Sequence, residues 1–221
     1  MMNRYTPKTK EDLRKAIELW SSNRDETQEI LGHISDWNTI LISDMSELFY
    51  GYEFNDTLNW NTSNVKDMNG MFWSCENFNQ LLNWDTSNVT DMGSMFENCS
   101  KFNSSLNFNT SNVTDISSMF ENCSNFNSFI IFTDTSNVKD MSIMFKNCSN
   151  FDQKLDFNTS NVEYMNEMFN GCNSLNKFFL WNLSSLTQQP NNGVIEFSDS
   201  VKIYDSNVYD NSIFNSDPVL K

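Results

Sequence analysis

Apolar and polar positions recur along most of this chain with a period of about 24 residues. The series of valines and the series of cysteines have the same spacings of 24, 24, 25 and 24 residues, at Val65, Val89, Val113, Val138 and Val162 and at Cys75, Cys99, Cys123, Cys148 and Cys172. A fixed period of this length is typical of coils that stack on one another, because a single coil cannot bury its own apolar face. The pattern therefore predicts a solenoid.

Each repeat contains an alternating and a helix-like segment. Apolar residues at the seventh and ninth positions after each cysteine, such as Leu106 and Phe108 after Cys99, alternate as in a short strand. The spacing Met-x-x-Met-Phe-x-x-Cys fits one to two helical turns. We expect a right-handed α/β solenoid of about seven coils, each a short strand plus a short helix, stacked over roughly 33 Å. The coils are marked by Trp37, Trp60, Trp84, Phe108, Phe132, Phe157 and Trp181.

The two ends of the chain depart from the repeat. Within residues 1–29, Thr9 and Asp12 resemble a helix start, and the apolar spacing that follows predicts a helix of roughly residues 10–20. We interpret this helix as a cap on the first coil; the alternative is a docking helix for a partner. Residues 30–186 form the repeat region, and its first copy is degenerate. Residues 187–221 are read as a C-terminal cap and acidic tail, with strands predicted at 194–197 and 201–204 and flexible chain elsewhere.

Polar residues also recur at fixed positions. Asp67, Asp91, Asp115 and Asp140 each precede the residue that opens the expected helix, a methionine or, after Asp115, Ile116, where a carboxylate can accept from free backbone N–H groups. We interpret them as N-caps. Asparagines precede each valine, and an asparagine, or Asp152 in one coil, follows the apolar residue three positions after each cysteine. They predict ladders of side chains that bond the backbone of adjoining coils.

The charge and hydropathy of the chain restrict which classes of partner it can bind and where in the cell it is expected. The 14 basic and 29 acidic residues give a net charge of −15, which disfavours nucleic acid and anionic membrane as partners. No apolar stretch is long enough to cross a bilayer. The polar, basic start lacks a signal-peptide core, so the chain as written is expected to be cytoplasmic.

The repeated chemical groups favour structure over catalysis. The cysteines form an odd-numbered column, which indicates reduced, buried thiols, although a redox or metal role is the alternative. His33 is the one histidine, so a base for nucleophilic cysteine chemistry is missing near the column. The aspartate column lacks the Gly-rich turns of calcium-binding solenoids. We therefore predict no catalytic residue, no metal and no cofactor.

The repeated phrase supports a family resemblance. Residues 84–96 read Trp-Asp-Thr-Ser-Asn-Val-Thr-Asp-Met-Gly-Ser-Met-Phe, and the repeats over residues 30–186 resemble the leucine-rich-repeat-like family of BspA-type bacterial surface proteins and mycoplasma lipoprotein repeats. The helix leading into Ile34–Trp37 is also similar to that family. The resemblance implies a leucine-rich-repeat-like solenoid at the cell surface or secreted, used in adhesion or protein recognition, without a general catalytic role.

The expected binding surface is the outward side of the strands. The candidate residues lie between the core positions of four coils, and Phe129 and Ile131 interrupt an otherwise polar face as the predicted hot spot. The full set is Gln80, Asn83, Ser104, Asn107, Ser128, Phe129, Ile131, Gln153, Lys154 and Asp156.

Two functions from different classes follow from this surface. The first is a non-enzymatic module that binds a protein partner in adhesion or host interaction. The second is a structural protein whose solenoids pack in a larger assembly such as a virion or surface layer, with self-association through the solenoid ends. Solenoid ends that are covered by caps favour the binding module, and uncovered ends favour the structural protein. An enzyme would need a pocket with converging titratable groups.

Overall fold

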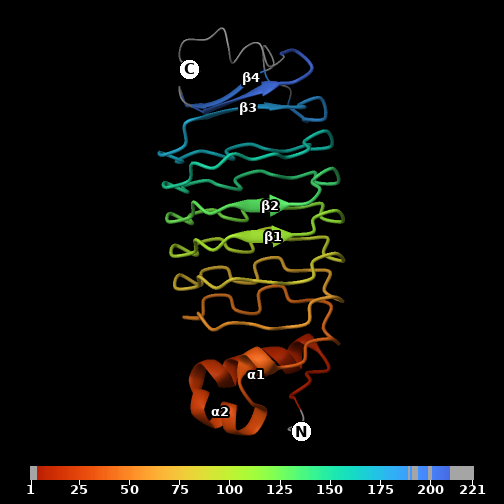
Figure 1. The fold of residues 1–221 in the computed structure, drawn as a ribbon, viewed down its shortest axis with the longest axis vertical. Coiled ribbons are helices and arrows are strands. Elements are labelled where there is room, and N and C mark those ends of the chain that lie inside the picture. The colour runs from red at the N-terminus through yellow and green to blue at the C-terminus, as the bar shows by residue number, and fades with distance from the viewer. Residues whose placement is uncertain (1–3, 189, 191–193, 199–200, 210–221) are drawn as a thin grey trace.

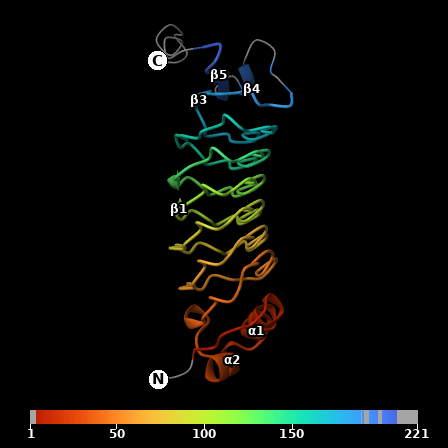
Figure 2. The same ribbon diagram turned by 90° about the vertical axis from the view of Figure 1, so that its right-hand side faces the viewer.

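The chain folds into a single column of stacked coils with helices at its N-terminal end. The computed structural model describes residues 4–188, 190, 194–198 and 201–209. Helices α1 (Lys10–Ser22) and α2 (Arg24–Leu31) are followed by the 3₁₀ helix η1 (Ile34–Asp36), and the coils then rise to the C-terminal strands (Figures 1 and 2).

Helix α1 covers the first coil. Thr9 caps it, and the reciprocal bonds between Thr9 and Asp12 form the capping box expected from the sequence. Leu13, Ile17 and Trp20 are almost fully buried, so the helix predicted for residues 10–20 is confirmed, with its apolar face against the coils. Helix α2 was not predicted, because its only apolar residues, Ile30 and Leu31, are adjacent and do not repeat at helical spacing. Thr27 is the one residue that α2 buries.

The coils pair in parallel through one wall of strands and extended segments. Strand β1 (Leu106–Phe108) pairs with β2 (Ile130–Phe132), and Asn107 lies opposite Ile131. Outside the strand wall, at the residue before each Met-x-x-Met-Phe-x-x-Cys segment, further parallel bridges join Asp44, Asp67, Asp91, Asp115, Asp140 and Tyr164 in sequence. The 23-residue step from Asp44 to Asp67 and the 25-residue step from Asp115 to Asp140 therefore leave this ladder in register.

The opposite wall differs from the expectation: no helix forms at the Met-x-x-Met-Phe-x-x-Cys segments. Alternate N–H groups leave the coil, as when Ser94 donates to Ser117 O over 2.8 Å and Phe96 to Met119 O over 2.9 Å. The intervening N–H groups close tight turns, as when Glu97 donates to Ser94 O over 3.0 Å. Ser94 and its equivalents adopt a positive φ, which is incompatible with a right-handed helix. The short helices of the sequence prediction are therefore wrong, and turns that bond to the next coil replace them.

The C-terminal end closes with a small mixed sheet. Strand β3 (Lys177–Trp181) pairs in parallel with β5 (Val201–Asp205), and β4 (Val194–Ser198) pairs antiparallel to the far edge of β5. Both strands predicted from residues 194–197 and 201–204 are thus confirmed. Because Lys177 lies opposite Val201, β5 keeps the 24-residue register and adds one more strand to the stack. The predicted flexible tail falls mainly on residues 210–221, outside the described residues.

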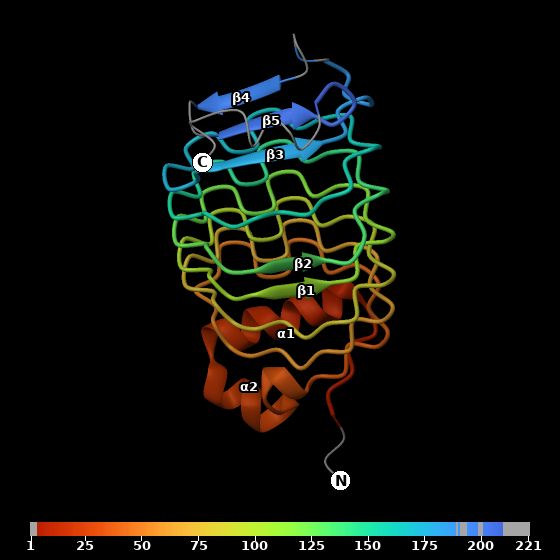
Figure 3. The ribbon, with the colours of Figure 1, turned by 45° about the horizontal axis from the view of Figure 1, so that its top comes forward.

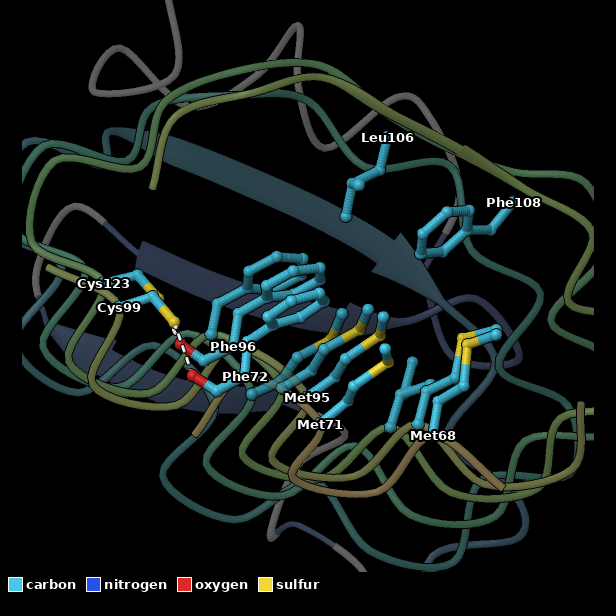
Figure 4. Packing of buried hydrophobic residues seen from close by; sticks show 14 of the residues in the cluster. Met68, Met71, Phe72, Met95, Phe96, Cys99, Leu106, Phe108 and Cys123 are labelled. Carbon is cyan, nitrogen blue, oxygen red and sulfur yellow. Dashed lines mark hydrogen bonds between the residues drawn. The ribbon is translucent and has the colours of Figure 1, made fainter. Parts of the chain in front are cut away.

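Stacked side chains fill the space between the two walls. The rings of Phe49, Phe72, Phe96, Phe120, Phe145 and Phe169 are 5.3–5.7 Å apart between neighbours and within 10° of parallel. Figure 4 shows this stack beside rows of methionines, with Leu106 and Phe108 pointing in from the strand wall. Each residue type therefore packs against its own copy in the next coil, which fixes the register of the column.

The first prediction concerns the attachment of α1 to the coils. Asp56 accepts from Trp20 Nε1 over 2.9 Å and from the Arg24 guanidinium over 2.6 Å. We expect Asp56→Ala to lower the free energy of unfolding by about 1–3 kcal/mol, because the buried indole N–H loses its acceptor. Urea denaturation, with hydrogen exchange of α1 amides, measures the change.

Gln80 provides the matched control, since it occupies the position of Asp56 one coil later but bonds only to exposed Asn55. Gln80→Ala should stay within about 0.5 kcal/mol of the wild type. Equal effects of the two substitutions would show that the Trp20 contact does not hold the cap.

Candidate functional site

The strand wall presents an outward face built by simple alternation. In β1, Leu106 and Phe108 are buried and Asn107 is exposed, and Leu82, Asn83 and Trp84 repeat this pattern one coil earlier. Because successive side chains of an extended chain point to opposite sides, each coil turns two positions outward here, Ser105 and Asn107 in the coil of β1 and Phe129 and Ile131 in the coil of β2. Figure 3 shows that β1, β2, β3 and β5 cross the same face of the column.

Four of the ten predicted site residues belong to an internal ladder. Gln80, Ser104, Ser128 and Gln153 are half-buried, and each donates to the asparagine one coil below. The same asparagine oxygens also accept backbone N–H groups, as when Asn103 N donates to Asn79 Oδ1 over 2.8 Å. These four side chains stabilise contacts between coils, so they lie at the border of the face.

The other six predicted residues are exposed on the face. Asn107, Lys154 and Asp156 lie on the coils next to Phe129 and Ile131, whose side chains are 72% and 56% exposed, and Asn83 lies one coil beyond Asn107. The register places Asn107 beside Ile131, and stacking of Phe132 on Phe157 at 5.8 Å places the coil of Lys154 and Asp156 on the other side. The structure therefore brings the predicted hot spot and its polar neighbours together.

Three further apolar residues share these two positions and were not predicted as site residues. Leu81 is 56% exposed two coils before Phe129, while Phe178 and Leu180 of β3 are half-buried two coils after it. Counting the sixth and eighth positions after every cysteine would have found all three. They extend the apolar character of the face along the column.

The cysteine column is buried and free of disulfides, as predicted. Each thiol donates to the carbonyl of a phenylalanine in the preceding coil, with Cys99 Sγ 3.0 Å from Phe72 O and Cys123 Sγ 2.9 Å from Phe96 O (Figure 4). Burial raises the pKa of Cys75 and of Cys172 to about 12, and it also raises the pKa of each of the three central thiols well above the ordinary value. These thiols therefore stay protonated and act as hydrogen-bond donors between coils.

The aspartate column caps turns instead of helices. Asp91 Oδ1 accepts from Gly93 N over 2.9 Å, and Asp67, Asp115 and Asp140 accept in the same way from the residue two positions on. Burial raises the pKa of Asp67, and nearby Asp91 and Asp44 add to this rise. Within the described part of the chain, no group of three or more acidic, histidine or cysteine side chains is placed to hold a metal ion.

A shallow hollow lies on another side of the column. It has a volume of about 420 Å³ and is lined by Asn137, Lys139, Asn161, Glu163, Ser185 and Thr187. Its polar groups are largely engaged, since Lys139 pairs with Glu163 at 3.3 Å and Asn161 Nδ2 donates to Ser136 O over 2.7 Å. The described helices include none with the length and apolar character needed to cross a membrane.

These stacked, interchangeable coils define a repeat protein. The chain belongs to the family described as "Mycoplasma protein of unknown function, DUF285", whose model matches twice in tandem, over residues 17–107 and 106–202. The two matches together run from within α1, through the coils, to the start of β5. Comparisons with curated proteins and with solved structures give no significant match.

The second prediction concerns the dependence of stability on pH. The thiols of the folded chain have pKa values raised above the ordinary value of 9.0, to about 12 for Cys75 and Cys172. The unfolded chain then releases protons first, so stability is fully present below pH 9 and is lost as the pH rises from 9 towards 12. Each thiol contributes a slope of up to about 1.4 kcal/mol per pH unit to the free energy of unfolding.

The substitution Cys123→Ala separates the contribution of thiol titration to the pH dependence of stability from the contributions of tyrosine and lysine titration. The variant should be about 1–2 kcal/mol less stable at neutral pH, because it loses a packed sulfur and its hydrogen bond to Phe96 O. Above pH 9 its stability should fall less steeply than that of the wild type in chemical denaturation. Parallel pH profiles would contradict the assignment.

Proposed function

We propose that this protein is a non-enzymatic recognition module that binds a protein partner through the outward strand face centred on Phe129 and Ile131. The observation that carries the proposal is a difference between two neighbouring coils of this chain. The preceding coil has Ser105 and Asn107 at these two positions, so the fold accepts polar residues there, yet β2 exposes a phenylalanine and an isoleucine. Exposed apolar side chains that the fold does not need are typical of binding hot spots.

We further propose that the stack is a leucine-rich-repeat-like solenoid of the BspA type. The repeated Trp-Asp-Thr-Ser-Asn-Val phrase and the parallel wall of strands support this assignment. The resemblance to BspA-type surface proteins supports a role in adhesion or host interaction at the cell surface. The long regular face suits such a role, since solenoids commonly bind through their extended side.

The alternative is a structural protein that packs its solenoids end to end in a larger assembly. That function needs open ends, whereas α1 buries Leu13, Ile17 and Trp20 against the first coil and Asp56 fixes it there. At the other end, β4 runs antiparallel to β5 and interrupts the parallel ladder. Both features favour a monomeric binder, with a light-scattering mass near 25.7 kDa.

The third prediction tests the proposed face with residues from the chain's own repeat. The double variant Phe129→Ser/Ile131→Asn copies the preceding coil, so its stability should stay within about 0.5 kcal/mol of the wild type. A photo-crosslinking residue at exposed Asn107, used in native material, captures the partner for identification by mass spectrometry. The purified partner should then bind the double variant at least about tenfold more weakly than the wild type.

Leu41→Ser is the matched control, because Leu41 is 58% exposed on the first coil, away from β2. Its affinity for the captured partner should equal that of the wild type. Equal binding by the double variant would remove Phe129 and Ile131 from the site, and a mass of several chains in light scattering would favour the structural alternative.

A further inference from the structure

Resting on the proposed function, we infer that the partner presents a basic side chain beside an apolar one, with the apolar group on Phe129 and Ile131 and the Lys or Arg between Asp134 and Asp156. The partner is thus a protein segment of mixed apolar and basic character. Three features of the same region support this inference: an inserted residue, two carboxylates that have no ion-pair partner among the described residues, and a turn that does not need its charge.

The inserted residue marks this coil as unusual. The interval between Cys123 and Cys148 is 25 residues, and the extra residue lies at Thr133–Asp134, directly after β2. Both residues are exposed. The single insertion within the regular cysteine series thus falls next to the apolar pair Phe129 and Ile131, and it places Thr133 before Asp134, which takes the turn position of Asn109.

In other coils, an uncharged asparagine closes the turn that Asp134 closes in this one. Asp134 Oδ1 accepts from Ser136 N over 2.8 Å, and Asn109 Oδ1 accepts from Ser111 N in the same way over 3.1 Å. Asn61 and Asn158 repeat this bond in two more coils. An amide therefore serves the turn as well as a carboxylate does, so the negative charge of Asp134 is surplus to the fold. The bonds from Ser136 lower the pKa of Asp134, which keeps it ionised at neutral pH.

The second carboxylate lies on the neighbouring coil. Asp156 is exposed, and it takes the position in its coil that Ile131 takes in the coil before. Two coils before Asp156, the same position holds the uncharged Asn107. Within the described residues, neither Asp134 nor Asp156 has a Lys, Arg or His within ion-pair distance. Nearby Asp152, by contrast, is paired with Lys177 at 2.5 Å.

The charge balance around the apolar pair selects a basic partner. Lys154 lies beside Phe129 and offsets one of the two carboxylates, which leaves the surface negative, and the whole chain carries −15. Exposed carboxylates at the border of an apolar contact attract and orient a basic partner more than they add to contact area. An acidic partner would meet Asp134, Asp156 and the net charge of the chain together, so the surface disfavours it.

The fourth prediction uses a random 12-residue peptide library displayed on phage and selected against the full chain. Selected peptides should combine Lys or Arg with an adjacent aromatic or aliphatic residue. A synthetic copy, followed by fluorescence anisotropy, should bind Asp134→Asn/Asp156→Asn about three- to tenfold more weakly than the wild type at low salt. The difference should shrink at high salt, because the Debye length falls to about 3 Å at 1 M.

Two single substitutions sharpen the test. Asp85→Asn removes an equivalent turn carboxylate, which accepts from Ser87 N over 3.0 Å two coils away, and should leave affinity almost unchanged. Lys154→Ser removes a like charge from the path of a basic peptide and should strengthen binding slightly. Weaker binding by Lys154→Ser would indicate an acidic partner and overturn the inference.

Failure of this inference is distinguishable from failure of the proposed function. Peptides that lose binding to Phe129→Ser/Ile131→Asn but bind Asp134→Asn/Asp156→Asn as tightly as the wild type would overturn the basic partner and leave the binding face in place. A selection that yields no peptide dependent on Phe129 and Ile131 would overturn both.

Discussion

Hydrogen bonding between successive coils is the interaction on which the rest of this structure depends. On the turn wall, alternate N–H groups have their acceptor in the next coil, as when Phe96 N donates to Met119 O over 2.9 Å. Side chains complete the pairing: Thr86 Oγ1 donates to Asn109 O and Asn112 Nδ2 to Ser87 O, and both contacts repeat in the other coils. Since unpaired buried polar groups are costly, a coil is stable only between neighbours in register. This dependence explains why both ends of the column carry dedicated caps.

Packing between coils constrains the inward side chains, whereas the residues of the outward face can differ from coil to coil. Inward positions repeat almost unchanged because every phenylalanine, methionine and cysteine packs on its own copy, and a different volume would disturb two neighbours at once. Outward positions have no such partner, so Leu81, Ser105, Phe129, Lys154 and Phe178 occupy equivalent places. A regular scaffold with one irregular face supports a binding role, because departures from the repeat there serve no packing need.

Buried sulfur has a structural part in this scaffold. Each cysteine thiol donates to a carbonyl that already accepts an N–H within its own coil: Phe72 O accepts from Cys75 N over 2.9 Å and from Cys99 Sγ over 3.0 Å. A small apolar group with one weak donor fits this place, whereas an aliphatic side chain would leave the second acceptor position unused. Burial also raises the pKa of these thiols, so they stay protonated and keep the hydrogen that they donate.

The sequence by itself determined the period, the register, the core residues, the capping helix α1 and the position of the apolar pair on the outward face. These follow from local spacing and from the identity of stacked copies. The tertiary structure alone decided three other features. The Met-x-x-Met-Phe-x-x-Cys spacing suits a helix and a series of tight turns equally, and the neighbouring coil selects turns by accepting their N–H groups. Strand β5 joins the ladder although its sequence has lost the repeated phrase, because the edge of β3 needs a partner. Gln80, Ser104, Ser128 and Gln153 read as surface residues in a single coil, but the asparagine one coil away binds them. In each case the deciding contact joins residues about 24 positions apart, which local pattern cannot reveal.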